Sequence, residues 1–173
     1  IHLTRHLAVY WAPDRVRDGG RRQRHAVGHA VAERAPDLER AATNAVGQPV
    51  DPDPALDPAG YRTLMVWQLA ERYYRQPQLA TLLKAASPPR FMRPKEADLT
   101  ALLQLGELDY IWTYVSIART NGFRWLDLPP EINLSDPAQA ATYAEARVVL
   151  PGATRTSDSV EFRGEPIVYA LTI

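Results

Sequence analysis

Residues 50–173 are constrained above all by helical patterns that alternate with short runs of branched and aromatic residues. Leu64, Met65, Leu69 and Tyr73 recur at helical spacing and predict a helix over residues 57–74. This helix begins with an Asp-Pro pair. Such a pair often starts a helix, because the aspartate side chain accepts from exposed backbone N–H groups and proline has no N–H to satisfy.

The rest of this segment predicts further short helices and strands. Helices are expected over residues 97–105 and 116–120, and another is opened by Asp136-Pro137. Strands are expected over residues 108–115, 124–128, 147–150, 160–163 and 166–173, the last two joined by a turn at Gly164-Glu165. Helices that alternate with strands predict an α/β lobe.

Residues 1–49 form a different, poorly patterned segment. Their formal net charge is +3, and that of the remaining residues is −3. They contain all four histidines and a basic run at residues 15–24. One Ala-rich helix is plausible, over residues 26–42, but its few large apolar residues give little reason to expect a packed core. We therefore divide the chain into a segment 1–49, disordered or frame-shifted, and a partial binding lobe, 50–173.

Composition excludes several kinds of chemistry. The chain has no cysteine, which rules out disulfides and thiolate metal sites. Its zero net charge, and the lack of aromatics within the basic run, argue against nucleic acid as a partner. His25 and His29 share helical spacing but lack a third ligand, so we interpret them as surface residues. The second segment has no histidine, the commonest general base near neutral pH, so we expect no enzyme.

Two motifs and one tyrosine are candidates for an anion site. The sequence Asp57-Pro58-Ala59-Gly60-Tyr61 begins a helix, and a helix N-terminus offers N–H groups and partial positive charge to an anion. Arg93-Pro94-Lys95-Glu96 lies between a strand and a helix, and Tyr114 ends a strand. The structural alternatives are a plain capped helix, a solvated charged turn and a core tyrosine.

Three blocks, taken in order, resemble the tungstate/molybdate-binding proteins of ABC importers. They read DPALDPAGYRTLMVWQLAERYY, RPKEADLTALLQLGELDYIWTYVSIARTNGFRWLDLPPEINLSDP and SVEFRGEPIVYALTI. The resemblance covers residues 50–173. It implies an incomplete two-lobe fold of the type II periplasmic binding-protein class, with a mixed sheet flanked by helices and an anion cleft between lobes.

The resemblance also implies a ligand set. It carries two metal-coordinating carboxylates onto Asp57 and Glu96, and further ligand-binding residues onto Ala59, Gly60, Tyr61 and Tyr114. A neighbouring Asp53-Pro54 pair offers a second aspartate of the same form. A carboxylate repels an anion by roughly 4 kcal/mol at ~4 Å near a protein surface. The pair therefore suits molybdenum or tungsten, which accept further oxygen ligands, and would exclude sulfate.

Partners and location follow from the same resemblance. It implies a monomeric component that captures molybdate or tungstate without a cofactor and delivers it to a membrane permease, in the periplasm or outside the cell and membrane-associated when full-length. The chain shows no signal peptide, and we expect it to be part of a longer protein. The alternatives are an effector-sensing domain of a transcription regulator and a sulfate- or phosphate-type binding protein. The Arg-, Ala-, Gly- and His-rich residues 1–49 resemble an out-of-frame reading of GC-rich DNA, which sequencing across codons 40–55 would test.

Overall fold

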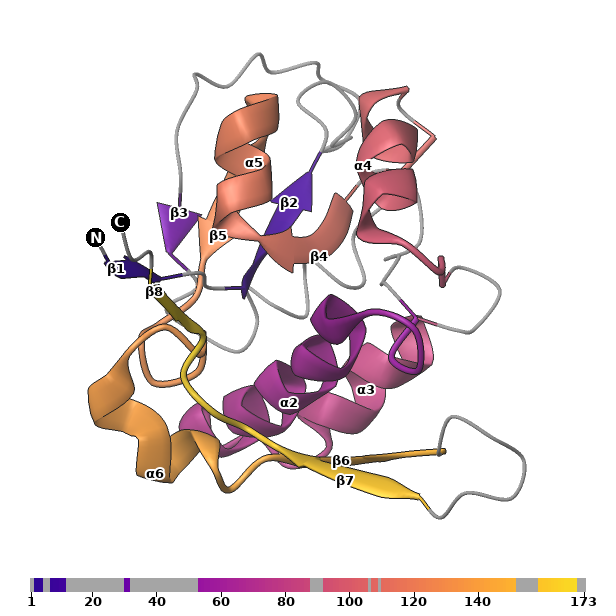
Figure 1. The fold of residues 1–173 in the computed structure, drawn as a ribbon. Helices are drawn as coiled ribbons and strands as arrows, with labels where there is room; N and C mark the ends of the chain where they lie inside the picture. Colours follow the sequence, from indigo (N-terminus) through magenta and orange to yellow (C-terminus); the bar gives the residue numbers. More distant parts are fainter. Residues whose placement is uncertain are drawn as a thin grey trace.

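The computed structural model describes residues 2–4, 7–11, 30–31, 53–87, 92–105, 107–108, 110–151 and 159–170. Figure 1 shows two tiers. A sheet with helices α4 (Glu96–Gln104) and α5 (Val115–Asn121) forms one tier. The other tier consists of helices α2 (Pro58–Tyr73), α3 (Leu79–Ala86) and α6 (Ala140–Tyr143) with a β-hairpin. Helices and strands alternate through the second part of the chain, as predicted, so the fold is a mixed α/β arrangement.

The main sheet has four strands in the order β3-β5-β2-β4. Strand β2 (Leu7–Trp11) runs antiparallel to both β4 (Tyr110–Tyr114) and β5 (Arg124–Asp127), and β3 (Ala30–Val31) runs parallel to β5. Strand β4 leads directly into α5 (Val115–Asn121), which ends at Gly122 in the left-handed region, at φ 67°. The strands β4 and β5 and helix α5 confirm the predicted elements to within two residues.

The other described strands form two sheets of two strands each. A hairpin pairs β6 (Arg147–Leu150) with β7 (Val160–Arg163), and both match the predicted ranges. Strand β8 (Val168–Ala170) pairs with β1 (His2–Thr4) rather than with β7. Residues 164–167, between β7 and β8, have no regular structure, so the turn predicted at Gly164-Glu165 is not observed. The Gly164 N–H donates to the Ala146 carbonyl, next to the hairpin.

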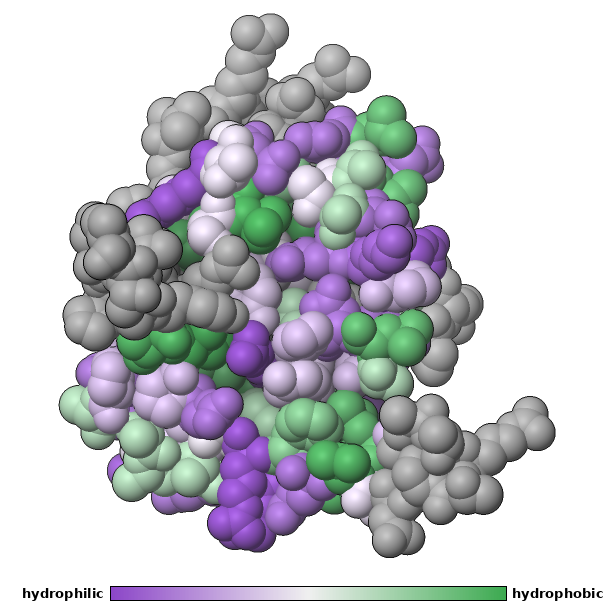
Figure 2. All heavy atoms as spheres, viewed as in Figure 1, coloured by the Kyte–Doolittle hydropathy of each residue, from purple (hydrophilic) through white to green (hydrophobic). Residues whose placement is uncertain are grey.

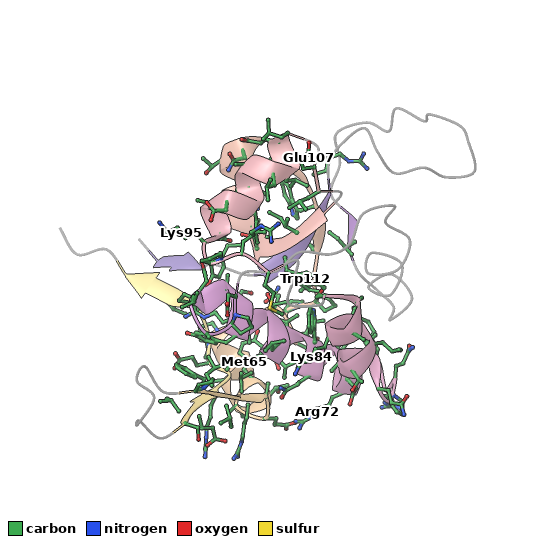
Figure 3. The ribbon with its side chains drawn as sticks, turned by 90° about the vertical axis from the view of Figure 1, so that its right-hand side faces the viewer. Met65, Arg72, Lys84, Lys95, Glu107 and Trp112 are labelled. Carbon is green, nitrogen blue, oxygen red and sulfur yellow. The ribbon has the colours of Figure 1, made fainter. Side chains whose placement is uncertain are left out.

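Helix α2 (Pro58–Tyr73) lies at the centre of the larger core. Met65 and Leu69 are buried as predicted, whereas Tyr73 is 43% exposed and packs edge-on against Tyr74. Trp67 meets Trp112 of strand β4 edge to face, with ring centroids 5.7 Å apart. In Figure 3, Trp112 lies between the sheet and the helix pair below it. This aromatic contact joins the two tiers.

Helix α3 (Leu79–Ala86) was not predicted. It packs against α2, and its own N-cap residue, Gln78, makes no side-chain capping bond. The Glu71 carboxylate of α2 accepts from the Ala80 N–H instead, at 3.0 Å. A short segment capped from another helix has no local start signal, which explains why the sequence pattern missed it.

The described residues of the first segment form strands β1, β2 and β3. The predicted helix over residues 26–42 is wrong at Ala30–Val31, which pair with β5 as a strand. Helix propensity is a weak preference that sheet pairing overrides. The remainder of that range lies outside the described residues, and the frame-shift hypothesis stays a prediction.

A short helical region connects β5 to the hairpin. It consists of η2 (Pro137–Gln139) and α6 (Ala140–Tyr143), opened by Asp136 as predicted. The side chain of Gln68 on α2 then fixes the hairpin, because its amide donates to the Arg147 carbonyl at 2.8 Å and accepts from the Arg147 N–H at 3.0 Å.

The surface is mixed in character. On the face shown in Figure 2, hydrophilic and hydrophobic residues are interspersed, and one hydrophobic patch lies low in the view, near the hairpin. Two hairpin valines, Val149 and Val160, are 62% and 47% exposed. Among the helices that the structure describes, none combines the length and apolar character needed to cross a lipid bilayer.

Candidate functional site

Asp57 is the N-cap of helix α2. Its Oδ1 accepts from the Ala59 N–H at 2.9 Å, and its backbone carbonyl accepts from the Gly60 N–H at 3.0 Å. Ala59 and Gly60 are buried at this helix start. The capped-helix interpretation is thus observed, and both N–H groups are already bonded to Asp57. An anion could take the Ala59 N–H only by displacing the Asp57 side chain, whereas the Gly60 N–H is bonded to the Asp57 backbone. The binding roles of Ala59 and Gly60 therefore stay predictions.

The second oxygen of Asp57 reaches another helix. Asp57 Oδ2 accepts from the Glu96 N–H at 3.1 Å, and Glu96 is the first residue of α4 (Glu96–Gln104). The N-cap residue of α4, Lys95, makes no side-chain capping bond of its own. In Figure 3, Lys95 lies where α4 begins. One carboxylate therefore caps two helices, and it holds the Asp-Pro motif against the Arg-Pro-Lys-Glu motif.

The same geometry separates Asp57 from Asp53. Both aspartates begin the sequence Asp-Pro-Ala, and Asp53 Oδ1 accepts from the Ala55 N–H at 2.8 Å. Only for Asp57 does the described structure give a bond to Glu96. The Asp53-Pro54 pair is thus a local turn next to the site.

Glu96 continues the chain of contacts to the sheet. Its Oε1 accepts from the Tyr114 N–H at 3.3 Å, where strand β4 ends. Glu96 follows Asp57 by 39 residues, and Tyr114 follows Glu96 by 18. The fold joins the three through two successive hydrogen bonds. The three candidates singled out in separate motifs therefore lie together.

The hydroxyl of Tyr114 meets a residue that the sequence did not single out. Arg62 Nη1 donates to Tyr114 Oη at 2.6 Å, and the guanidinium carbon lies 5.9 Å from the centroid of that ring. The ring centroid of Tyr61 lies 5.7 Å from the same guanidinium carbon. Tyr61 also stacks on Phe162 of β7, with centroids 4.7 Å apart. Arg62 directly follows the Asp-Pro-x-Gly-Tyr motif, and that adjacency was the available signal.

The arrangement combines opposite charges at one place. Two carboxylates, Asp57 and Glu96, can coordinate a hard, highly charged centre. One guanidinium and the N-termini of α2 and α4 can compensate the charge of oxygen atoms around it. The described part of the chain holds no group of three or more His, Cys, Asp or Glu that could bind a metal ion. The site is therefore built around a pair of carboxylates and a basic, aromatic flank.

A separate groove of about 500 Å³ lies between α2, α3 and β6. Much of its wall is apolar and includes Leu64, Trp67, Met92 and Leu150. Two cationic side chains, Lys84 and Arg147, also line it. None of the six predicted binding residues lines it. We therefore locate the candidate site by the hydrogen-bonded chain from Asp57 to Tyr114. His25, His29 and the basic run at residues 15–24 lie outside the described residues.

Comparison with known proteins identifies relatives for most of the chain. An uncharacterised solute-binding protein of Petrotoga mobilis is 45% identical over 121 residues, which are 70% of this chain and 37% of that protein. The molybdate/tungstate-binding protein WtpA of Thermococcus kodakarensis is 34% identical over 140 residues, covering 70% of this chain and 38% of its own length. A putative ABC transporter molybdenum-binding protein of Haloferax volcanii is 40% identical over 121 residues, covering 69% and 36%.

These relatives are much longer than the region that matches. The chain spans less than two fifths of the length of each of the three. No protein-family model matches the chain. The similarity confirms the predicted resemblance to solute-binding proteins and to their molybdate- and tungstate-binding members.

Proposed function

This chain is a partial homologue of solute-binding proteins, and we propose that it contributes one lobe of a site that captures molybdate or tungstate for an ABC importer. The observation that carries the proposal is the hydrogen-bonded chain from Asp57 through Glu96 to Tyr114. The lobe would be of the type II binding-protein class, and its role would be capture without catalysis.

The carboxylates favour an oxyanion with an expandable central atom. A bare divalent cation takes six or more oxygen ligands, and two carboxylates supply few of them. Molybdate and tungstate bring their own oxygens and can accept more at the metal. Sulfur in sulfate accepts none, so a sulfate would meet only repulsion, at roughly 4 kcal/mol for each pair of unit charges ~4 Å apart. Asp57 and Glu96 thus both ligate the metal and select against sulfate.

Other residues would hold the outer oxygens. Tyr114 can donate a hydrogen bond through its phenol. The N-termini of α2 and α4, at Ala59, Gly60 and Tyr61 and at Glu96, add partial positive charge near the carboxylates. Binding through the Ala59 N–H requires the Asp57 side chain to turn from its capping bond toward the metal. The Gly60 N–H donates to the backbone carbonyl of Asp57, and a turn of the side chain leaves that bond in place.

The partners follow from the relatives. One relative is named as a component of an ABC transporter, so a membrane permease is the proposed recipient of the anion. The protein would act as a monomer without a cofactor, outside the cytoplasmic membrane. A longer protein would bring a second lobe to the same anion.

Calorimetric titration of the 173-residue chain with tungstate, molybdate and sulfate tests the proposal. We expect heat of binding with the two metal oxyanions and none with sulfate. Binding of sulfate as tightly as of molybdate would contradict the role of the carboxylates. Absence of binding to all three anions would refute capture by this chain.

A Glu96→Gln variant tests the ligand role directly. Glutamine keeps a side-chain oxygen for the Tyr114 N–H but removes the charge, so molybdate and tungstate affinity should fall at least tenfold. The matched control is Glu107→Gln, because Glu107 is exposed and follows α4 at its other end (Figure 3). A variant that gains sulfate affinity and keeps molybdate affinity would exclude ligation as the main role of Glu96.

A further inference from the structure

We propose that Arg62 is the positioning residue of the site, which turns the Tyr114 hydroxyl so that its hydrogen is directed to the captured anion. The inference rests on the proposed oxyanion function and assigns a role to a residue outside both sequence motifs. Its basis is the short contact between Arg62 Nη1 and Tyr114 Oη, at 2.6 Å.

The direction of this hydrogen bond is fixed by chemistry. A guanidinium has N–H donors only, so the phenol oxygen must be the acceptor in the contact. The hydrogen of the Tyr114 hydroxyl is therefore not used in its bond to Arg62. Without the arginine, the hydroxyl could rotate and present a lone pair to the anion, which would repel it. With the arginine in place, the hydroxyl is held in the orientation that donates to the anion.

The guanidinium lies near two tyrosine rings. Its central carbon lies 5.7 Å from the centroid of the Tyr61 ring and 5.9 Å from that of Tyr114. Such distances are within the range of cation–π attraction. Tyr61 is in turn stacked on Phe162, with an angle of 24° between the rings. The planar group is thus part of an aromatic cluster in which Tyr61, Arg62 and Phe162 are each partly buried.

The position of the Tyr114 ring is fixed through its backbone. Tyr114 is 5% exposed, and its N–H donates to the Glu96 carboxylate. The phenol therefore extends from a fixed backbone to a fixed guanidinium, with a carboxylate at one end and a cation at the other. The nearby positive charge also polarises the O–H bond, which makes the phenol a stronger donor to an anion.

Because Arg62 acts through Tyr114, its effect on binding should depend on the tyrosine hydroxyl. This dependence separates a positioning residue from an independent ligand.

A double-mutant cycle tests the dependence. Affinity for tungstate is measured by calorimetry for the chain with Arg62→Gln, with Tyr114→Phe and with both changes. We expect each single change to weaken binding about ten- to hundredfold, as for a lost hydrogen bond to a charged group. The double variant should bind no more weakly than Tyr114→Phe by itself, within about twofold.

Two further variants distinguish positioning from charge and fold. Arg62→Lys keeps a charged donor and should restore part of the affinity lost in Arg62→Gln. Arg72→Gln removes a charge from the same helix, where the arginine is exposed and pairs with Glu145, and should bind as the unchanged chain does. Melting temperatures of the ligand-free variants show whether each one is folded.

Each outcome decides something specific. If Arg62→Gln weakens binding tenfold in the Tyr114→Phe background as well, Arg62 acts on the anion independently and the positioning role is wrong. Equal affinity of Arg62→Gln and the unchanged chain would also overturn it. If the unchanged chain binds no tungstate, the proposed function itself has failed, and the inference falls with it.

Discussion

Replacing Asp57 tests whether one carboxylate holds two helices together. In Asp57→Ala, α2 loses the bond from the Ala59 N–H and α4 loses the bond from the Glu96 N–H. Loss of an aspartate N-cap costs about 1 kcal/mol of stability. A hydrogen bond to a charged group contributes about 1.5 kcal/mol or more, and the lower value suits this partly exposed pair. We therefore expect Asp57→Ala to lower the free energy of unfolding by about 2.5 kcal/mol.

The chain contains a matched control with the same local sequence. Asp136-Pro137-Ala138 repeats the Asp-Pro-Ala of residues 57–59, and Asp136 Oδ1 accepts from the Ala138 N–H at 2.9 Å. Asp136→Ala should therefore cost about 1 kcal/mol, the local cap alone. The difference between the two variants isolates the bond across to α4. Asp57→Asn should fall between them, because its amide retains a single acceptor oxygen.

Urea denaturation followed by tryptophan fluorescence measures the three variants on one scale, since m-values should be unchanged. The reasoning is refuted if Asp57→Ala and Asp136→Ala have the same free energy of unfolding. In that case the bond from Asp57 to Glu96 would contribute nothing to stability. An m-value that changes in Asp57→Ala alone would indicate that α4 has become detached in the folded state.

Three further predictions concern the hairpin and its surroundings. In Gly164→Ala the new Cβ would lie 2.1 Å from the Tyr143 carbonyl oxygen, a backbone atom, so urea denaturation should show a loss of about 2–3 kcal/mol. Gln68→Ala removes both bonds to the Arg147 backbone and should cost about 1–2 kcal/mol, whereas Gln104→Ala, on the exposed face of α4, should cost less than about 0.5 kcal/mol. Burial raises the pKa of Tyr143 above its ordinary value of 10.0, so the stability it contributes is complete below that pH and is lost as pH rises through the folded pKa. Denaturation between about pH 9 and about pH 11 should therefore show a shallower decline for Tyr143→Phe than for the unchanged chain.

Much of the second segment could be predicted from sequence because its signals are local. Helix α2 has an Asp-Pro start and apolar residues at helical spacing. Strand β6 contains a run of branched residues, and β7 alternates Val160 and Phe162 with charged residues. Local pattern placed Asp57, Glu96 and Tyr114 at a helix start, in a charged turn and at a strand end, which are equally positions of purely structural residues. Their ligand roles were predicted from the resemblance to tungstate/molybdate-binding proteins.

The features that sequence did not predict depend on contacts between distant residues. Helix α3 is capped by Glu71 of another helix, and Asp57 caps α4 from 39 residues away. The contact of Arg62 with Tyr114 spans 52 residues, so no spacing rule indicates it. Strand β2 lies between β4 and β5 although its segment has a poor pattern. A one-dimensional pattern contains no record of which partner a side chain meets.

The pairing of Gln68 with Arg147 also has a consequence for contacts between separate chains. In an antiparallel hairpin, alternate residues direct their backbone groups away from the partner strand. The bonds of Gln68 to the Arg147 N–H and carbonyl therefore occupy the outward-facing backbone groups at the start of β6. A strand from another molecule would have to displace this amide before it could pair with Arg147. One glutamine thus protects the edge against the intermolecular β-pairing that leads to aggregation, beside the exposed Val149 where such protection matters most.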